Sequence, residues 1–163
     1  MKLLQNYIRP VFFYHLLLFL SFSISLNNLI ELQFINLLFY VFCHFIIIYM
    51  SLYYFNFILY FVFCAYGIFF DVLLLNDLGP HLLVFIFLLT IVSNSKKYFF
   101  NLSAKSVHYL ILFLLCLVFL VEMLLAEFIL NYSFDFKNFI IIILTGLIIF
   151  FPSIFVFSKL DRL

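Results

Sequence analysis

The sequence is poor in the residues from which a water-soluble surface is built. Only 9% of its 163 residues are charged and 69% are hydrophobic, whereas soluble domains have about 25% charged residues. There is no tryptophan, and glycine, proline and cysteine occur three times each, which excludes collagen-like, proline-rich and disulfide-rich chains. A net charge of +1 is too small for a nucleic-acid-binding surface. The composition indicates an integral membrane protein in a lipid bilayer.

Neither the few cysteines nor the start of the chain indicates a disulfide-rich, metal-binding or secreted protein. Cys43, Cys64 and Cys116 lie singly in apolar stretches, so neither a disulfide framework nor a cysteine-rich metal site is expected. Lys2 and Arg9 precede an apolar run, as in a secretory signal peptide. Because many apolar stretches follow, we expect a retained first helix instead.

What the sequence does contain is a series of apolar stretches separated by short polar segments. A crossing helix needs about 20 residues, because the hydrocarbon core is about 30 Å thick and a helix rises about 1.5 Å per residue. The stretch from Phe34 to Leu75 has only Asp71 as a charge and would reach about 60 Å, so we expect it to fold back near Met50 to Tyr54. We predict an all-α integral membrane protein with one transmembrane domain, residues 1–163. Its six helices are predicted at about 11–26, with Pro10 at the start, 34–49, 52–75, 81–93, 107–130 and 139–157.

The basic residues favour six crossings over five. Six crossings place both termini on one side, and seven of the eight basic residues lie on that side with only Lys137 opposite. These seven are Lys2, Arg9, Lys96, Lys97, Lys105, Lys159 and Arg162. Fusing the second and third helices would scatter them across both sides. Since basic residues favour the cytoplasmic side, we expect cytoplasmic termini. The acidic residues expected at the outer side are Glu31, Asp71, Asp77, Glu127 and Asp135, of which Asp77 and Asp135 are candidate helix caps.

Three polar residues fall inside predicted helices: Glu122, His15 and His44. Glu122 lies about 21 Å from the cytoplasmic end of its helix, where a carboxyl is costly unless it is protonated or paired. We therefore expect it to face other helices, either as a neutral hydrogen-bonded side chain or in contact with a partner helix or a bound solute. We expect the histidines to be hydrogen-bonded core residues, with no metal site.

Sequence motifs of catalysis are missing. There is no HExxH zinc motif, no phosphate-binding loop, no GxSxG elbow and no pair of aspartates on one helix face. We therefore predict a protein that is not an enzyme and that has no cofactor.

The most specific stretch runs from 65 to 83. Gly67 and Asp71 are four residues apart and share a helix face, and Leu78-Gly79 marks a turn before His81 opens the next helix. A glycine lets a neighbouring helix approach closely. Asp71 lies near a helix C-terminus, where the helix dipole disfavours an anion, so we expect His81 or free N–H groups of the next helix as compensating donors. The stretch is then either a partner-docking edge or a satisfied structural turn.

This stretch resembles the MreD family of rod shape-determining membrane proteins. The shared residues are Gly67, Asp71, Leu78, Gly79 and His81, with looser similarity at Arg9, Pro10 and Pro152 and a departure at Pro80. The resemblance implies a non-catalytic scaffold subunit of the bacterial cell-elongation complex in the inner membrane. It also implies MreC, MreB, RodA and a class B penicillin-binding protein as partners in the control of cell shape and peptidoglycan synthesis.

Two other functions are open at this stage. One is the six-helix substrate-binding subunit of a vitamin-type transporter, to which MreD proteins are similar in size and layout. Glu122, His15 and His44 would then line a pocket. The other, suggested by composition alone, is a subunit of an organellar respiratory complex. Each reading is compatible with a homo-oligomer.

Overall fold

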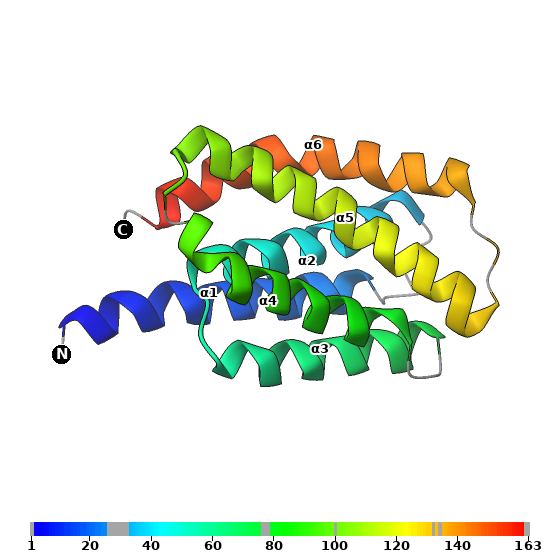
Figure 1. The fold of residues 1–163 in the computed structure, drawn as a ribbon, viewed down its shortest axis with the longest axis horizontal. Helices are drawn as coiled ribbons and strands as arrows, with labels where there is room; N and C mark the ends of the chain where they lie inside the picture. The colour runs from blue at the N-terminus through cyan, green and yellow to red at the C-terminus, as the bar shows by residue number, and fades with distance from the viewer. Residues whose placement is uncertain are drawn as a thin grey trace.

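In the computed structural model, the described part of the chain forms six α-helices that pack side by side, each roughly antiparallel to the next (Figure 1). They are α1 (Lys2–Ser25), α2 (Gln33–Tyr53), α3 (Ile58–Leu75), α4 (Pro80–Phe99), α5 (Ala104–Leu130) and α6 (Phe136–Leu160). The structure describes residues 2–25, 33–75, 79–99, 101–131, 133 and 135–161, with the backbone alone for 2–9, 33, 75 and 104. Within these ranges there is no strand.

Four of the helices, α2, α4, α5 and α6, are long and apolar enough to cross a membrane. The apolar parts of the other two, Pro10–Ser25 and Ile58–Leu74, are shorter. Both termini lie at one end of the bundle (Figure 1); we call it the terminal end, and the other the far end. The all-α fold is confirmed, and the helix composition supports a membrane protein.

Two predicted helix bounds were wrong because polar residues and proline do not interrupt the helices. Pro10 lies inside α1, which begins at Lys2, rather than at the helix start. Proline removes one backbone hydrogen bond from a helix, and α1 continues through Pro10 without interruption. α4 continues to Phe99 instead of ending near Ser93, because Asn94, Lys96 and Lys97 are exposed and leave the buried face of the helix apolar.

The predicted break between the second and third helices was also misplaced. Residues 54–57 form the turn, in which the Leu59 N–H donates to the Asn56 carbonyl at 2.9 Å. Met50 and Ser51 lie inside α2 and are buried. Ser51 does not end the helix because its hydroxyl donates to the Ile47 carbonyl one turn back, at 2.7 Å.

Side chains cap the N-termini of α5 and α6. Ser103 accepts from the Ser106 N–H, and Asp135 accepts from the Lys137 N–H, as predicted for Asp135. Asp77, Glu31 and Leu78 lie outside the described residues.

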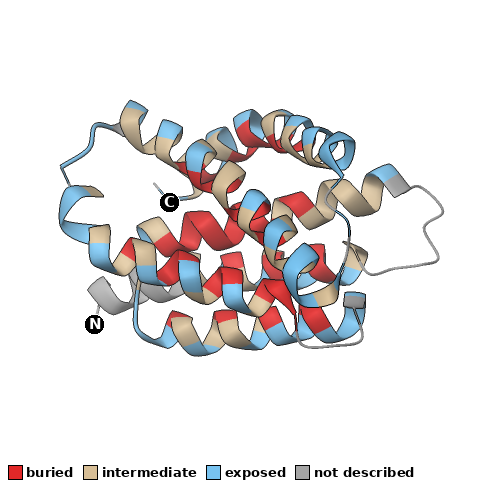
Figure 2. Cartoon of the chain, turned by 45° about the vertical axis from the view of Figure 1, so that its right-hand side comes forward, coloured by how far each residue is buried: buried red, intermediate tan, exposed pale blue. Residues whose placement is uncertain are grey.

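The centre of the bundle is α2, which contacts α1, α4, α5 and α6. Every residue from 43 to 51 is buried, and Figure 2 shows the buried residues gathered along the middle of the molecule. A helix that is apolar on all sides belongs in such a position. The outer faces instead carry exposed phenylalanine and leucine side chains, such as Phe61 and Phe128, as expected of faces that contact lipid.

Three tyrosine hydroxyls converge on Asp161 at the terminal end. Tyr14 of α1 donates at 2.6 Å and Tyr54, just after α2, at 2.5 Å, while Tyr49 of α2 donates to the second carboxylate oxygen. Asp161 directly follows α6. Its carboxylate therefore ties the end of α6 to α1 and α2.

We predict that Asp161→Ala lowers the free energy of unfolding by about 1–2 kcal/mol, since part-buried hydroxyl donors lose their acceptor. Denaturant or thermal unfolding of the purified protein in detergent measures the change. Glu127→Ala, which removes an exposed carboxyl near the far end of α5, is the matched control and should leave stability unchanged. Equal effects of the two substitutions would show that the tyrosine contacts contribute nothing.

Candidate functional site

The corner between α3 and α4 is built on Gly67. A Cβ atom at Gly67 would lie 2.6 Å from the Leu82 Cα and 3.0 Å from the Leu82 backbone nitrogen. Both are backbone atoms, so any larger residue would push the two helices apart. The neighbouring helix that the glycine was expected to admit is thus α4 of the same chain, and Gly79 is buried in the turn that leads to it.

Asp71, four residues after Gly67, caps the start of α4. It is fully buried, and its two carboxylate oxygens each accept one backbone N–H at 3.0 Å, from His81 and Leu82 respectively. Pro80, the first residue of α4, has no N–H, so these are the first two free donors of the helix. The carboxylate is stabilised by the positive end of the α4 dipole. Both kinds of donor expected for Asp71 are present, because Oδ1 also lies 2.7 Å from His81 Nδ1.

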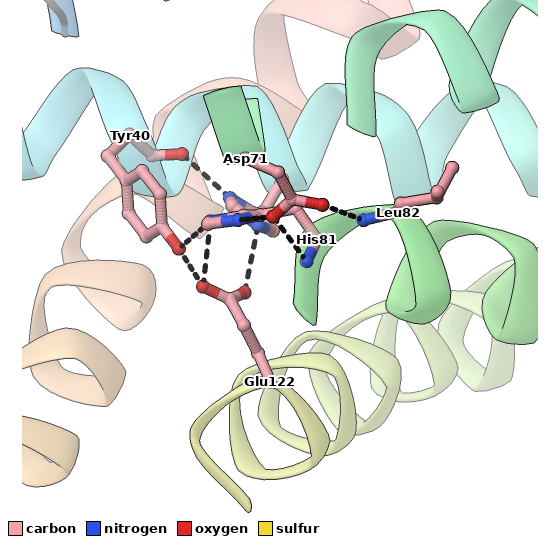
Figure 3. Close-up of polar contacts among 6 residues, drawn as sticks. Tyr40, Asp71, His81, Leu82 and Glu122 are labelled. Atoms are coloured by element: carbon pink, nitrogen blue, oxygen red, sulfur yellow. Dashed lines mark hydrogen bonds and ion pairs between the residues drawn. The ribbon is translucent and has the colours of Figure 1, made fainter. Parts of the chain in front are cut away.

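His81 connects this corner to α2 and α5. Its Nε2 lies 3.1 Å from Glu122 Oε1 and 3.0 Å from the Tyr40 hydroxyl, and the Tyr40 hydroxyl donates to the same Glu122 oxygen. His44 Nε2 lies 3.1 Å from Glu122 Oε2, and His44 Nδ1 lies 3.0 Å from the Tyr40 carbonyl oxygen. Figure 3 shows Tyr40, Asp71, His81 and Glu122 converging. We call Tyr40, His44, Asp71, His81 and Glu122 the buried polar cluster.

Aromatic rings enclose the buried polar cluster. Phe70 stacks on the His81 ring with 5.3 Å between centroids, and Phe85 and Phe119 pack against His44 at 5.4 and 4.9 Å. These rings shield one side of the cluster from water, which strengthens the polar contacts there and makes an unpaired polar atom costly.

A cavity of about 590 Å³ reaches the cluster from the far end. Its lining includes Tyr40, His81 and Glu122 together with Asn36, whose side-chain oxygen is buried without a hydrogen-bond partner among the described residues. The remaining lining residues lie near helix ends, for example Leu130 at the end of α5. The cluster therefore forms one wall of a cavity that opens at the end opposite the termini.

The structure brings most of the polar residues selected from the sequence into one place. Glu122 faces helices, as predicted, and meets His44, His81 and, through His81, Asp71. His15 stands apart, since it is half-buried in α1 with its ring stacked on Tyr66 of α3. Sequence reasoning missed Tyr40, although its spacing of four from His44 places the two on one helix face.

No family model matches the chain, and neither the curated proteins nor the solved structures contain a match.

We predict that Gly67→Ala lowers the free energy of unfolding by about 1–3 kcal/mol, the usual cost of overpacking, because its methyl group would meet the backbone of Leu82. Gly146→Ala is the matched control, since the one atom closer than 3.4 Å to its Cβ would be the Leu115 Cδ2 at 2.9 Å, the end of a side chain rather than a backbone atom. Thermal unfolding in detergent should rank the Gly67 variant well below the Gly146 variant. The reverse order would contradict the close approach of α3 and α4.

Proposed function

We propose that this protein is a non-catalytic scaffold subunit of the bacterial cell-elongation complex in the inner membrane, similar to the MreD family. The observation that carries the proposal is the corner between α3 and α4. Gly67, Asp71 and His81, three of the residues by which the chain resembles that family, have one joint task there, because Gly67 permits the approach and Asp71 binds His81. Gly79 lies buried in the same turn. Residues that form one structural contact together support the resemblance to the family more strongly than five identical residues alone.

The arrangement of the helix ends supports six crossings with cytoplasmic termini. Lys96 and Lys97 lie in the last turn of α4, Lys105 in the first turn of α5 and Lys159 in the last turn of α6. All these turns are at the terminal end (Figure 1). Basic residues favour the cytoplasmic side of a membrane, so the terminal end is the one that we assign to the cytoplasm.

Recognition in this proposal uses helix faces inside the membrane. The described connections between helices are short, while exposed apolar side chains such as Phe61, Phe128 and Phe151 cover the outer faces. A single-span partner such as MreC would pack against one of these faces, and the basic terminal end would face the cytoplasmic MreB filaments. The buried polar cluster holds the scaffold rigid beneath these faces.

We predict that a tagged copy of the chain retains the MreC protein of the same bacterium through detergent purification, and that depletion of the chain turns rod-shaped cells round. Asp71→Ala should reduce MreC retention, because α3 and α4 lose the contact that orients them, whereas Glu127→Ala should not.

A reporter fused after residue 163 should be active in the cytoplasm. Loss of MreC during purification together with unchanged rods on depletion would refute the proposal.

A second candidate function is favoured by the cavity. Its volume of about 590 Å³ suits a small molecule, and its wall offers Glu122, Tyr40 and the unpartnered oxygen of Asn36. These features support a substrate-binding subunit of a vitamin-type transporter. Of the three residues expected to line the pocket, only Glu122 does so, since His44 is not part of the cavity wall and His15 lies elsewhere in the bundle.

If this second function holds, one member of a panel of water-soluble vitamins should raise the unfolding temperature. A ligand at 100 times its Kd stabilises the folded state by about 2.7 kcal/mol. Glu122→Gln should abolish the shift and His15→Gln should preserve it. A panel without any shift at millimolar concentration would leave the scaffold as the only surviving proposal.

A further inference from the structure

Three metal-ligating side chains from three different helices meet in the buried polar cluster. One ligand atom each from His44 of α2, His81 of α4 and Glu122 of α5 lies within 4.8 Å of the other two, and all three residues are buried. We propose that these residues bind a divalent transition-metal ion. This inference does not depend on the proposed function, because an ion at this place would fasten the helices of a scaffold or of a transporter subunit alike.

The distances suit such an ion. Ligand atoms about 2.0–2.2 Å from a tetrahedral zinc ion are about 3.3 Å from one another. Each histidine Nε2 lies 3.1 Å from its nearest Glu122 oxygen. The three ligand atoms lie within 4.8 Å of one another, so an ion between them requires the two imidazoles to move closer together.

Both imidazoles are already held in the orientation of metal ligands. Metal-bound histidines usually donate their other ring N–H to a carboxylate or a backbone carbonyl. His81 Nδ1 lies 2.7 Å from the Asp71 carboxylate, and His44 Nδ1 lies 3.0 Å from the Tyr40 carbonyl oxygen. Each of these contacts leaves Nε2, with its lone pair, directed at Glu122.

The count of hydrogen-bond donors leaves a place for a cation. With each imidazole neutral and its single proton on Nδ1 donated outward, four acceptor atoms face one another: two Nε2 atoms and the two oxygens of Glu122. The Tyr40 hydroxyl supplies one proton, to Glu122 Oε1. Among the described residues, His44 Nε2 and Glu122 Oε2 remain buried without a hydrogen-bond partner, although they are 3.1 Å apart. A metal ion would be the common partner of these acceptors.

The donor set indicates the class of ion. Two imidazole nitrogens with one carboxylate are typical of zinc sites with an open position and of other first-row transition metals. Calcium and magnesium prefer oxygen ligands. The open position would be reached through the far-end cavity, whose wall contains His81 and Glu122. The sequence led us to expect no metal site because the ligands lie in three separate helices.

The test uses the full chain, purified in detergent with a tag free of histidine and stripped with a chelator. We expect one Zn²⁺ per chain by elemental analysis after desalting. Co²⁺ should give visible d–d absorption bands that Zn²⁺ removes and that excess Mg²⁺ does not. Failure to retain zinc in stoichiometric amount, or displacement of Co²⁺ by Mg²⁺, would overturn the proposal.

Substitutions locate the site. We expect Glu122→Gln and His44→Gln to abolish the Co²⁺ bands and to weaken Zn²⁺ binding by at least about 100-fold, and Asp71→Asn to weaken it by about 10–100-fold, as for residues that orient a ligand. His15→Gln and His108→Gln, which change histidines outside the cluster, should bind as the unaltered chain does. Size-exclusion chromatography shows whether each variant is folded. If His44→Gln fails to fold, the nearly isosteric Glu122→Gln tests the site alone. Equal binding by Glu122→Gln and the unaltered chain would disprove the assignment.

Discussion

Two carboxyl groups buried in an apolar helix bundle are the constraint on which the far half of this structure depends. An acidic side chain in such surroundings is tolerable only when other groups of the protein bind it. Asp71 and Glu122 are both buried and both meet histidines. Each carboxyl therefore requires particular partners on other helices, and their combined requirements determine how α2, α3, α4 and α5 sit against one another.

The Gly67 contact is a condition for this arrangement. Asp71 reaches the first N–H groups of α4 only if α3 and α4 are nearly in backbone contact, and Gly67 one turn earlier permits that approach. The start of α4 then places His81 at Glu122. One missing side chain on α3 thus determines whether the Glu122 carboxylate on α5 meets His81 in addition to Tyr40 and His44.

The sequence was sufficient to predict the features of this structure that depend on local contacts or on a periodic apolar pattern. Apolar stretches identified the helices, and the Asp71 contact with His81 was foreseeable because ten residues separate them across one turn. The helix bounds at Pro10, Ser51 and Lys96 were not, since a helix in a bundle absorbs residues that would end it in water. The meeting of His44, His81 and Glu122, and that of Tyr14 and Tyr49 with Asp161, depends on how separate helices rotate about their axes, which apolar periodicity does not specify.

The same polar contacts explain how so uniform a sequence specifies one packing. Within a membrane, burying one apolar side chain against another instead of lipid gains little, so phenylalanine and leucine alone leave helices free to rotate and slide. α2 passes through the centre and is held at two points, by Tyr40 and His44 in the buried polar cluster and by Tyr49 at Asp161. These two polar contacts on one helix limit both its rotation and its position along the bundle. The fully buried apolar residues between them, Phe45 to Ile48, then pack in the orientation that the polar contacts set.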